Sequence, residues 1–354
     1  MKTQLVEEEK QILDALRSLE LYPQANKEEE DENFKQGERL PPTAEYLHRR
    51  GRLIYEMKTK ASADWTNAFE RLRTKEFIQS DGPKYMLTRV GRSLARKVRR
   101  ERIGQRFSDY LIRSESSKAH SSFCERVFGK DLCQANLMDM IQLEKLLEVL
   151  NLTAENRVLD MGCGIGKIAE YISDRTRAHV LGIDIALKAI QRAQARTQEK
   201  RDRLEFREGD LNDLSLPPAS VDTIIAVATL HYAENLEKTV GQMKTILTPQ
   251  GQMGLFTFQY RGSNESLDIL RPDKTQIGQA LKKYNLVFRT WDFTEREKDI
   301  WRKELKAATD LESEFRAEGN LDLCEDRIEE CKADLPRLEA GEKRRYLYHV
   351  QMRQ

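Results

Sequence analysis

The sequence has few cysteines and no long apolar run. Its five cysteines are scattered through 354 residues and none stands in a Cys-x-x-Cys pair. This pattern argues against a disulfide framework and against a structural zinc site, so we predict no metal ligands. No stretch approaches the roughly 18 apolar residues that a membrane-spanning helix needs. The first ten residues lack an apolar signal region, and we expect a cytoplasmic protein with no membrane partner.

An excess of charge of one sign is also absent. The chain has 60 Lys and Arg against 59 Asp and Glu, which gives a formal net charge of +1. This balance excludes a protein that is polybasic or polyacidic overall, but it allows local patches. Charged residues make up 34% of the chain, above the ~25% of an average domain, which indicates long solvated helices. At roughly 100–200 residues a domain, the length predicts two or three domains.

Residues 1–105 are predicted to form a small α+β domain. Three helical patterns come first, at 4–19, 43–57 and 62–77. Two short β-like runs then flank the turn signal Asp81-Gly82-Pro83, and a basic helix follows at 89–103. This order resembles the winged-helix superfamily. The resemblance implies a dimerisation module, and the ten Lys and Arg from Lys84 to Arg113 leave contact with nucleic acid as an alternative.

After residue 150 the hydrophobic pattern changes to short strands that alternate with helices. The strand patterns lie at 157–160, 180–184, 204–210, 221–227, 254–258, 286–293 and 345–351. Such alternation predicts a doubly wound, Rossmann-like α/β sheet over 151–354. Residues 106–150 are predicted to form helices that connect the two domains.

A glycine-rich turn follows the first of these strands. It has the spacing D-x-G-x-G-x-G, formed by Asp160, Gly162, Gly164 and Gly166. A strand, a glycine loop and a helix in this order present backbone N–H groups to a ligand, and glycine lets the ligand approach the backbone closely. The dinucleotide fingerprint would need a glycine at position 167, which is a lysine here.

Two carboxylates stand at the ends of the next two strands. Asp184 is placed to accept both hydroxyls of a ribose, and Asp210 is placed for an adenine amino group. The alternative is that the glycines form only a tight turn and that both acids cap strand ends. The spacing of all these features together favours a ligand site.

These residues resemble the class I S-adenosylmethionine-dependent methyltransferases, over about residues 130–260. The resemblance implies S-adenosylmethionine as the cofactor, with the three glycines beneath its amino-acid end. It also implies that residues before the first strand close over the cofactor. The remaining positions that it suggests as cofactor contacts are Asp160, Asp184, Asp210, Leu211 and Gln134.

The acceptor should bind where the fourth and fifth strands end, because ligands of such sheets lie at the carboxyl ends of the strands. The candidates there are His231, Tyr232 and Tyr260. His231 is either a general base or a wall residue beside the cofactor. Methyl transfer from a sulfonium is an in-line displacement, so positioning and desolvation can supply much of the catalysis without a base.

Residues 295–340 have a helical pattern and interrupt the end of the sheet. They carry 15 Asp and Glu against 9 Lys and Arg. We interpret them as a helical insertion, which is either a lid over the active site, with Asn320 and Arg327 as polar contacts, or a solvated hairpin at an oligomer interface. An acidic cover and several aromatic residues favour an amine acceptor.

The sequence therefore predicts a methyltransferase that uses S-adenosylmethionine and acts on a small molecule. A winged-helix DNA-binding regulator and a nucleic-acid methyltransferase are the alternatives. The chain lacks the Asn/Asp-Pro-Pro-aromatic tetrad of amino-methylating nucleic-acid enzymes and has Ala228-Thr-Leu-His at the end of the fourth strand. Formation of a homodimer is a further prediction of the sequence.

Overall fold

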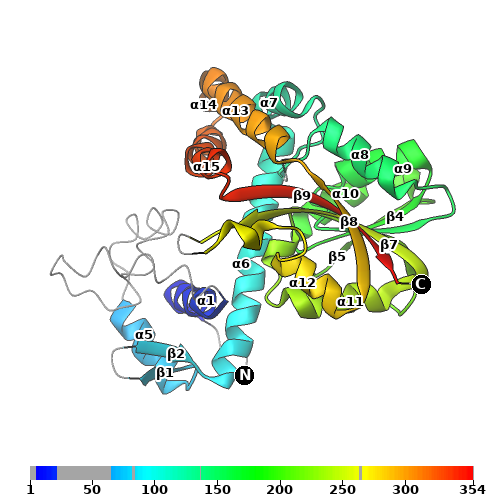
Figure 1. Cartoon of the computed structure of the whole chain (residues 1–354). Coiled ribbons are helices and arrows are strands. Elements are labelled where there is room, and N and C mark those ends of the chain that lie inside the picture. The colour runs from blue at the N-terminus through cyan, green and yellow to red at the C-terminus, as the bar shows by residue number, and fades with distance from the viewer. Residues whose placement is uncertain (1–4, 22–64, 82–83, 136, 263–264, 354) are drawn as a thin grey trace. The chain divides into compact units, whose positions relative to one another are not determined.

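The computed structural model describes residues 5–21, 65–81, 84–135, 137–262 and 265–353. The chain divides into two compact units, Met1–Ile103 and Gly104–Gln354, which are described separately (Figure 1). The helix predicted over 43–57 lies outside the described residues, and so do Gly82 and Pro83 of the predicted turn.

The first unit is a small α+β assembly. Its elements are α1 (Glu7–Leu21), α5 (Trp65–Thr74), β1 (Ile78–Asp81), β2 (Lys84–Leu87) and the first half of α6 (Arg89–Ser116). The two strands pair antiparallel, with Ile78 opposite Leu87. Both of these side chains pack with Ile12, Phe69 and Val98 in the core of the unit. The strands and α6 occur in the predicted order, and the winged-helix assignment stays a prediction.

Basic residues of α6 pair with acidic residues of α1. Arg92 donates to Glu20 at 2.8 Å and Arg99 donates to Asp14 at 3.1 Å. Arg102 forms an ion pair with Glu7. These ion pairs reduce the positive charge that this helix can offer to a phosphate backbone.

The second unit contains a seven-stranded mixed sheet, which confirms the predicted Rossmann-like fold. The strand order is β5-β4-β3-β6-β7-β9-β8, and β3 to β7 pair parallel. Only β9 runs against its neighbours, between β7 and β8. The strands are β3 (Arg157–Met161), β4 (His179–Asp184), β5 (Leu204–Glu208), β6 (Val221–Val227), β7 (Leu247–Tyr260), β8 (Leu286–Asp292) and β9 (Lys343–Met352).

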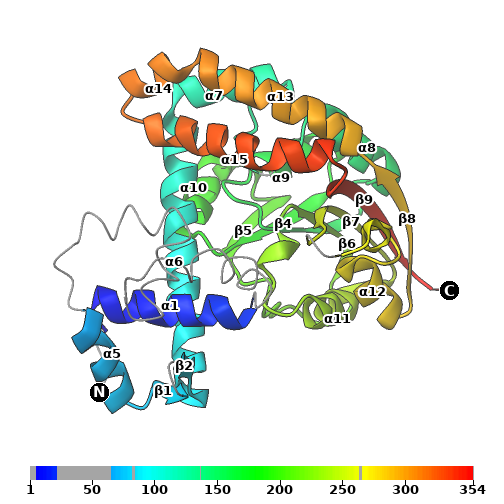
Figure 2. The same ribbon diagram turned by 60° about the vertical axis from the view of Figure 1, so that its left-hand side comes forward.

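Helices cover both faces of this sheet (Figure 2). One face packs against α8 (Met140–Leu150), α9 (Lys167–Thr176) and α10 (Leu187–Arg196), and the other packs against α11 (Leu236–Ile246) and α12 (Gln276–Lys283). The central strands are apolar at nearly every position because both of their faces are buried, as Val221–Val227 illustrates.

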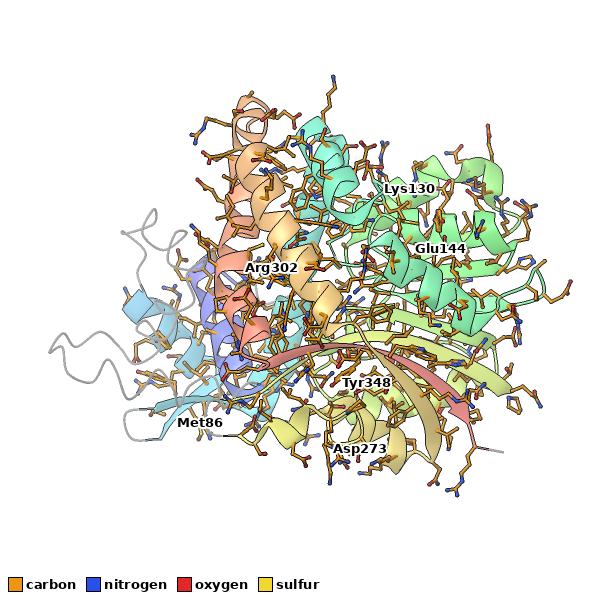
Figure 3. All side chains as sticks on the ribbon, turned by 45° about the horizontal axis from the view of Figure 1, so that its top comes forward. Met86, Lys130, Glu144, Asp273, Arg302 and Tyr348 are labelled. Carbon is orange, nitrogen blue, oxygen red and sulfur yellow. The ribbon has the colours of Figure 1, made fainter. Side chains whose placement is uncertain are left out.

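The predicted helical insertion is confirmed between β8 and β9. It consists of α13 (Thr294–Asp310), α14 (Glu312–Ala317) and α15 (Leu321–Glu339), and it packs against α7 (Lys118–Phe128). Arg302 of α13, labelled in Figure 3, pairs with Glu339 of α15 at 3.0 Å. Because β9 is antiparallel to both β7 and β8, the insertion begins and ends at the edge where the parallel strands terminate.

Candidate cofactor and acceptor site

The glycine loop lies at the carboxyl end of β3 and is fixed to β4. The backbone N–H groups of Gly162 and Cys163 both donate to the carbonyl of Ile183, at 2.8 and 3.1 Å. Gly162, Gly164 and Gly166 all have a positive φ, of 78°, 54° and 75°. Such values favour glycine, and they bend the chain sharply before α9 begins at Lys167.

Packing also requires glycine at two of these positions. A Cβ on Gly162 would lie 2.3 Å from Thr229 Oγ1, and a Cβ on Gly166 would lie 2.4 Å from Cε1 of Phe206. A Cβ on Gly164 would approach nothing closer than Leu111 Cδ1, at 3.4 Å. A Cβ on Gly164 would therefore make only van der Waals contact with Leu111, while the absence of a Cβ at the outer two glycines lets the loop pack against Thr229 and Phe206.

Asp184 ties the end of β4 to this loop. Its Oδ2 accepts from the backbone N–H of Gly164 at 2.8 Å, and its Oδ1 accepts from that of Ala186, also at 2.8 Å. Burial raises the pKa of Asp184, and these amide contacts oppose the rise. Each carboxylate oxygen keeps a second lone pair, so the side chain can accept further hydrogen bonds from paired hydroxyls.

Asp160 is a second buried carboxyl beneath the loop. It is only 5% exposed, at the end of β3. Burial, and then the charge of Asp184, raise its pKa to about 7. A cationic group bound at the loop would stabilise the ionised form of Asp160. The two carboxylates, Asp160 and Asp184, therefore fit a ligand that carries an ammonium group and a ribose.

Asp210 and Leu211 follow the end of β5, which neighbours β4. Asp210 Oδ1 accepts from the backbone N–H of Asn212 at 2.8 Å and from its Nδ2 at 3.0 Å. Leu211 is partly buried against the core. The structure thus brings both residues to the same edge as the glycine loop, and their contact with adenine stays a prediction.

The second half of α6 packs against this edge. A Cβ on Gly104 would lie 2.6 Å from the carbonyl oxygen of Ile185, so the helix approaches the turn after β4 closely. Leu111 packs in one apolar cluster with Ile165, Ala186 and Cys133. That the residues before the first strand close over a cofactor stays a prediction.

Of the predicted acceptor residues, His231 and Tyr232 lie in a short 3-10 helix (Leu230–Tyr232) after β6, and Tyr260 ends β7. His231 and Tyr232 have ring centroids 4.0 Å apart, and Tyr232 meets Phe107 edge-on at 5.5 Å. Tyr260 is 45% exposed at the end of β7. Partial desolvation, and then the positive charges of Arg345 and Lys343, lower the pKa of His231 to about 4, although the residue keeps an exposed surface. His231 is therefore neutral at pH 7, and it is a weak base.

Comparison with known proteins bears on the core of this site. A family model described as a methyltransferase domain matches residues 158–251, which run from β3 into β7 and include the glycine loop, Asp184 and Asp210. The chain has a class I methyltransferase core. The predicted resemblance is thereby confirmed for this part of the chain.

Relatives of the methyltransferase core match only parts of their own chains. The 27-O-demethylrifamycin SV methyltransferase of Amycolatopsis mediterranei is 32% identical over 140 residues, which are 39% of this chain and 52% of the relative. Phosphoethanolamine N-methyltransferase 1 of Zea mays is 26% identical over 231 residues, which are 62% of this chain and 46% of the relative. The chain thus spans about half the length of these curated relatives.

Solved structures share the fold of the methyltransferase core. The phosphoethanolamine N-methyltransferase 2 of Haemonchus contortus, solved with phosphomonomethylethanolamine and S-adenosylhomocysteine, aligns with a TM-score of 0.58 at 18% identity. The alignment covers 70% of this chain and 60% of that one. At this identity the likeness shows the fold alone.

Sequence reasoning missed two buried cations beside the acceptor edge. Lys343 and Arg345 begin β9, where they stand opposite Tyr260 and Phe258, and they are 1% and 0% exposed. Lys343 Nζ pairs with Asp334 at 2.8 Å and lies 4.1–4.3 Å from the ring centroids of Phe258 and Trp301. These rings thus surround a cation of the protein itself. The signal was available, because Lys343, Arg345 and Leu347 share one face of a strand.

Gln134 has a different local role from the one that the resemblance implies. Its Oε1 accepts from the backbone N–H of Leu132 at 2.9 Å, and its Nε2 donates to the carbonyl of Lys130 at 3.0 Å. The side chain is buried and holds its own loop together. Its contact with a cofactor stays a prediction.

The two predicted polar residues of the insertion both contact the segment before the sheet. Arg327 donates to the hydroxyl of Tyr110 at 2.7 Å and to the carbonyl of Gln134 at 3.4 Å. Asn320 Oδ1 accepts from Arg113 at 3.1 Å, and Asp322 pairs with the same guanidinium. The insertion is thereby joined to α6 and to the loop that precedes α8.

Proposed function

We propose that the protein transfers a methyl group from S-adenosylmethionine to a small-molecule acceptor. The observation that carries this proposal is the 2.8 Å hydrogen bond between Gly164 and Asp184, which joins the glycine loop to the acid expected to hold a ribose. Both residues lie within the segment that matches the methyltransferase family. When bound, S-adenosylmethionine supplies an electrophilic methyl group on a sulfonium.

The residues of the chain would act by binding and positioning. Asp184 would accept hydrogen bonds from the ribose, and Asp160 would balance the charge of an ammonium at the loop. His231, neutral at pH 7, would form the wall beside the reacting atoms. The insertion would cover the acceptor and exclude water, which favours in-line transfer because the reactants are held in place.

The proposed acceptor group is an amine. The Zea mays relative and the Haemonchus contortus protein are both phosphoethanolamine N-methyltransferases. The insertion also has six more acidic than basic residues, from 15 and 9, which favours a cationic ligand.

Calorimetric titration with S-adenosylhomocysteine tests the cofactor assignment. Asp184→Asn keeps one oxygen acceptor for the loop and removes the charge that favours the ribose hydroxyls, so we expect binding at least tenfold weaker than in the wild type. The matched control is Asp202→Asn, because Asp202 is exposed at the turn after α10. Absence of binding by the wild-type protein to both S-adenosylmethionine and S-adenosylhomocysteine would remove the proposal.

A further inference from the structure

Two glutamates lie on the buried face of α13, seven residues apart. Glu297 and Glu304 are both 0% exposed. Glu297 is well supplied with partners, because it accepts from Gln142 Nε2 and from Trp301 Nε1, each at 3.1 Å, and lies 3.8 Å from Arg345 Nε. Its role is to fix the start of the insertion to α8 and β9.

Glu304 lacks such partners. Its Oε2 lies 3.7 Å from Cys331 Sγ, a weak contact, and its Oε1 has no hydrogen-bond partner among the described residues. No ion pair to Glu304 is found in that part of the chain either. A buried carboxyl oxygen without a donor is unfavourable, and a hydrogen-bond donor from a bound ligand would satisfy it.

A second incomplete polar group lies in the same layer between the insertion and the helices before the sheet. His120 of α7 is buried, its Nδ1 lies 3.6 Å from Cys124 Sγ, and its Nε2 has no partner among the described residues. Its ring centroid is 6.5 Å from that of Tyr110, whose hydroxyl accepts from Arg327. The charge of Arg327 acts on both Glu304 and His120, and each of these two side chains has one atom without a hydrogen-bond partner among the described residues.

The charges around Glu304 favour a cation as that further group. Burial raises the pKa of Glu304 to about 7. The charged neighbours that act on it are Arg327, which lowers the pKa, and Glu330 and Glu297, which raise it. Arg327 is already engaged by Tyr110, Gln134 and Glu330. Glu297 already lies beside Arg345, so with Glu304 ionised the two acids Glu304 and Glu330 face the single positive charge of Arg327.

We propose that Glu304 binds an ammonium group of the acceptor beneath the insertion. This inference rests on the proposed methyltransferase function and deepens it, because it names a residue that would select the substrate. An ammonium has up to three N–H donors, one of which completes Oε1, and its positive charge favours the ionised carboxylate. The insertion would then serve as the cover that carries the recognition residue.

The test compares ammonium probes with nitrogen-free counterparts on the full chain saturated with S-adenosylhomocysteine. The pairs are ethanolamine with ethylene glycol and sarcosine with butyrate, and binding is measured by saturation-transfer NMR titration. We expect the wild type to bind at least one ammonium probe tenfold or more tightly than its counterpart. Glu304→Gln should lose this preference, while Glu295→Gln should keep it, because Glu295 lies on the same helix with its side chain 83% exposed.

Each other outcome has a defined meaning. The assignment is overturned if the wild type and Glu304→Gln show the same preference, or if the wild type binds no ammonium probe. An ordered water would then donate to Oε1 in place of the ligand. Failure of S-adenosylhomocysteine itself to bind overturns the proposed function. If Glu304→Gln does not fold, Glu304→Asp withdraws the carboxylate by one methylene, and an undiminished preference in that variant likewise overturns the assignment.

Discussion

At the scale of single residues, the site concentrates acidic groups that are costly to bury. Asp160 and Asp184 lie near the carboxyl ends of the neighbouring strands β3 and β4, and each carboxylate, buried or partly buried, needs hydrogen-bond donors or a counter-charge. Backbone amides partly meet this need for Asp184. Burial and the charge of Asp184 raise the pKa of Asp160 to about 7, and a cationic ligand at the loop would lower it.

The pH dependence of stability tests this view of Asp160. Its pKa is about 7 in the folded protein and about 3.9 in an unfolded chain, so the folded state holds an extra proton between these values. The contribution of Asp160 to stability therefore falls as pH rises from about 4 to 7 and is level above. Asp160→Asn removes that loss.

Urea unfolding at pH 5 and pH 8 measures the difference. Relative to the wild type, Asp160→Asn should gain on the order of 1–4 kcal/mol of unfolding free energy between pH 5 and pH 8. Asp202→Asn, a change at an exposed acid, should gain nothing. A gain that is the same at both pH values would contradict a raised pKa at Asp160.

Residues of the cofactor edge were predictable because their signal is local. The glycines, Asp160 and Asp184 stand at fixed spacing around one strand–turn–helix, so the sequence alone locates them. Lys343, Arg345 and Glu304 were missed because a charged residue in a sequence is normally exposed. Alternation along β9 places Lys343 and Arg345 on the same face as Leu347, but the burial of Glu304 depends on how α13 packs against α15 and α7.

At the scale of elements, the glycine loop is defined by both its backbone and its neighbours. Gly166 and Gly319 have similar φ values, of 75° and 71°. A Cβ on Gly166 would lie 2.4 Å from the ring of Phe206, whereas a Cβ on Gly319 would meet nothing within 4 Å. The two positions therefore separate backbone strain from steric overlap.

Alanine at each position should reveal that separation. Gly319→Ala should cost about 1 kcal/mol, because an L-residue in the left-handed region is strained. Gly166→Ala should cost about 2–5 kcal/mol, since overlap with Phe206 adds to the same strain. Chemical denaturation of both variants measures the costs. If both variants lose the same unfolding free energy, the loop can shift to relieve the overlap with Phe206, which contradicts the fixed geometry described above.

The sheet topology, more than the sequence of the insertion itself, determines where the insertion lies. Its helical pattern predicts α13 to α15, and the antiparallel β9 then forces both of its ends to the carboxyl edge. What the pattern could not supply was the set of tertiary contacts, such as that of Arg327 with Tyr110. Its role as a lid stays a proposal.

At the scale of the whole molecule, apolar helix length and charge pairing bear on which partners the protein can bind. No helix in the described ranges is long and apolar enough to cross a membrane. The ion pairs of Arg92, Arg99 and Arg102 with α1 leave less charge for nucleic acid than the sequence suggests. Dimerisation and contact with nucleic acid both stay predictions for the first unit.

Hydrogen exchange of the full chain, with and without S-adenosylhomocysteine, tests the central claim most directly. The claim is that the loop between β3 and α9, together with the ends of β4 and β5, binds the cofactor. We therefore predict slower exchange of backbone amides at 160–167, 184–186 and 210–212 when the ligand is present. Unchanged exchange in these three segments, with protection elsewhere or nowhere, would contradict it.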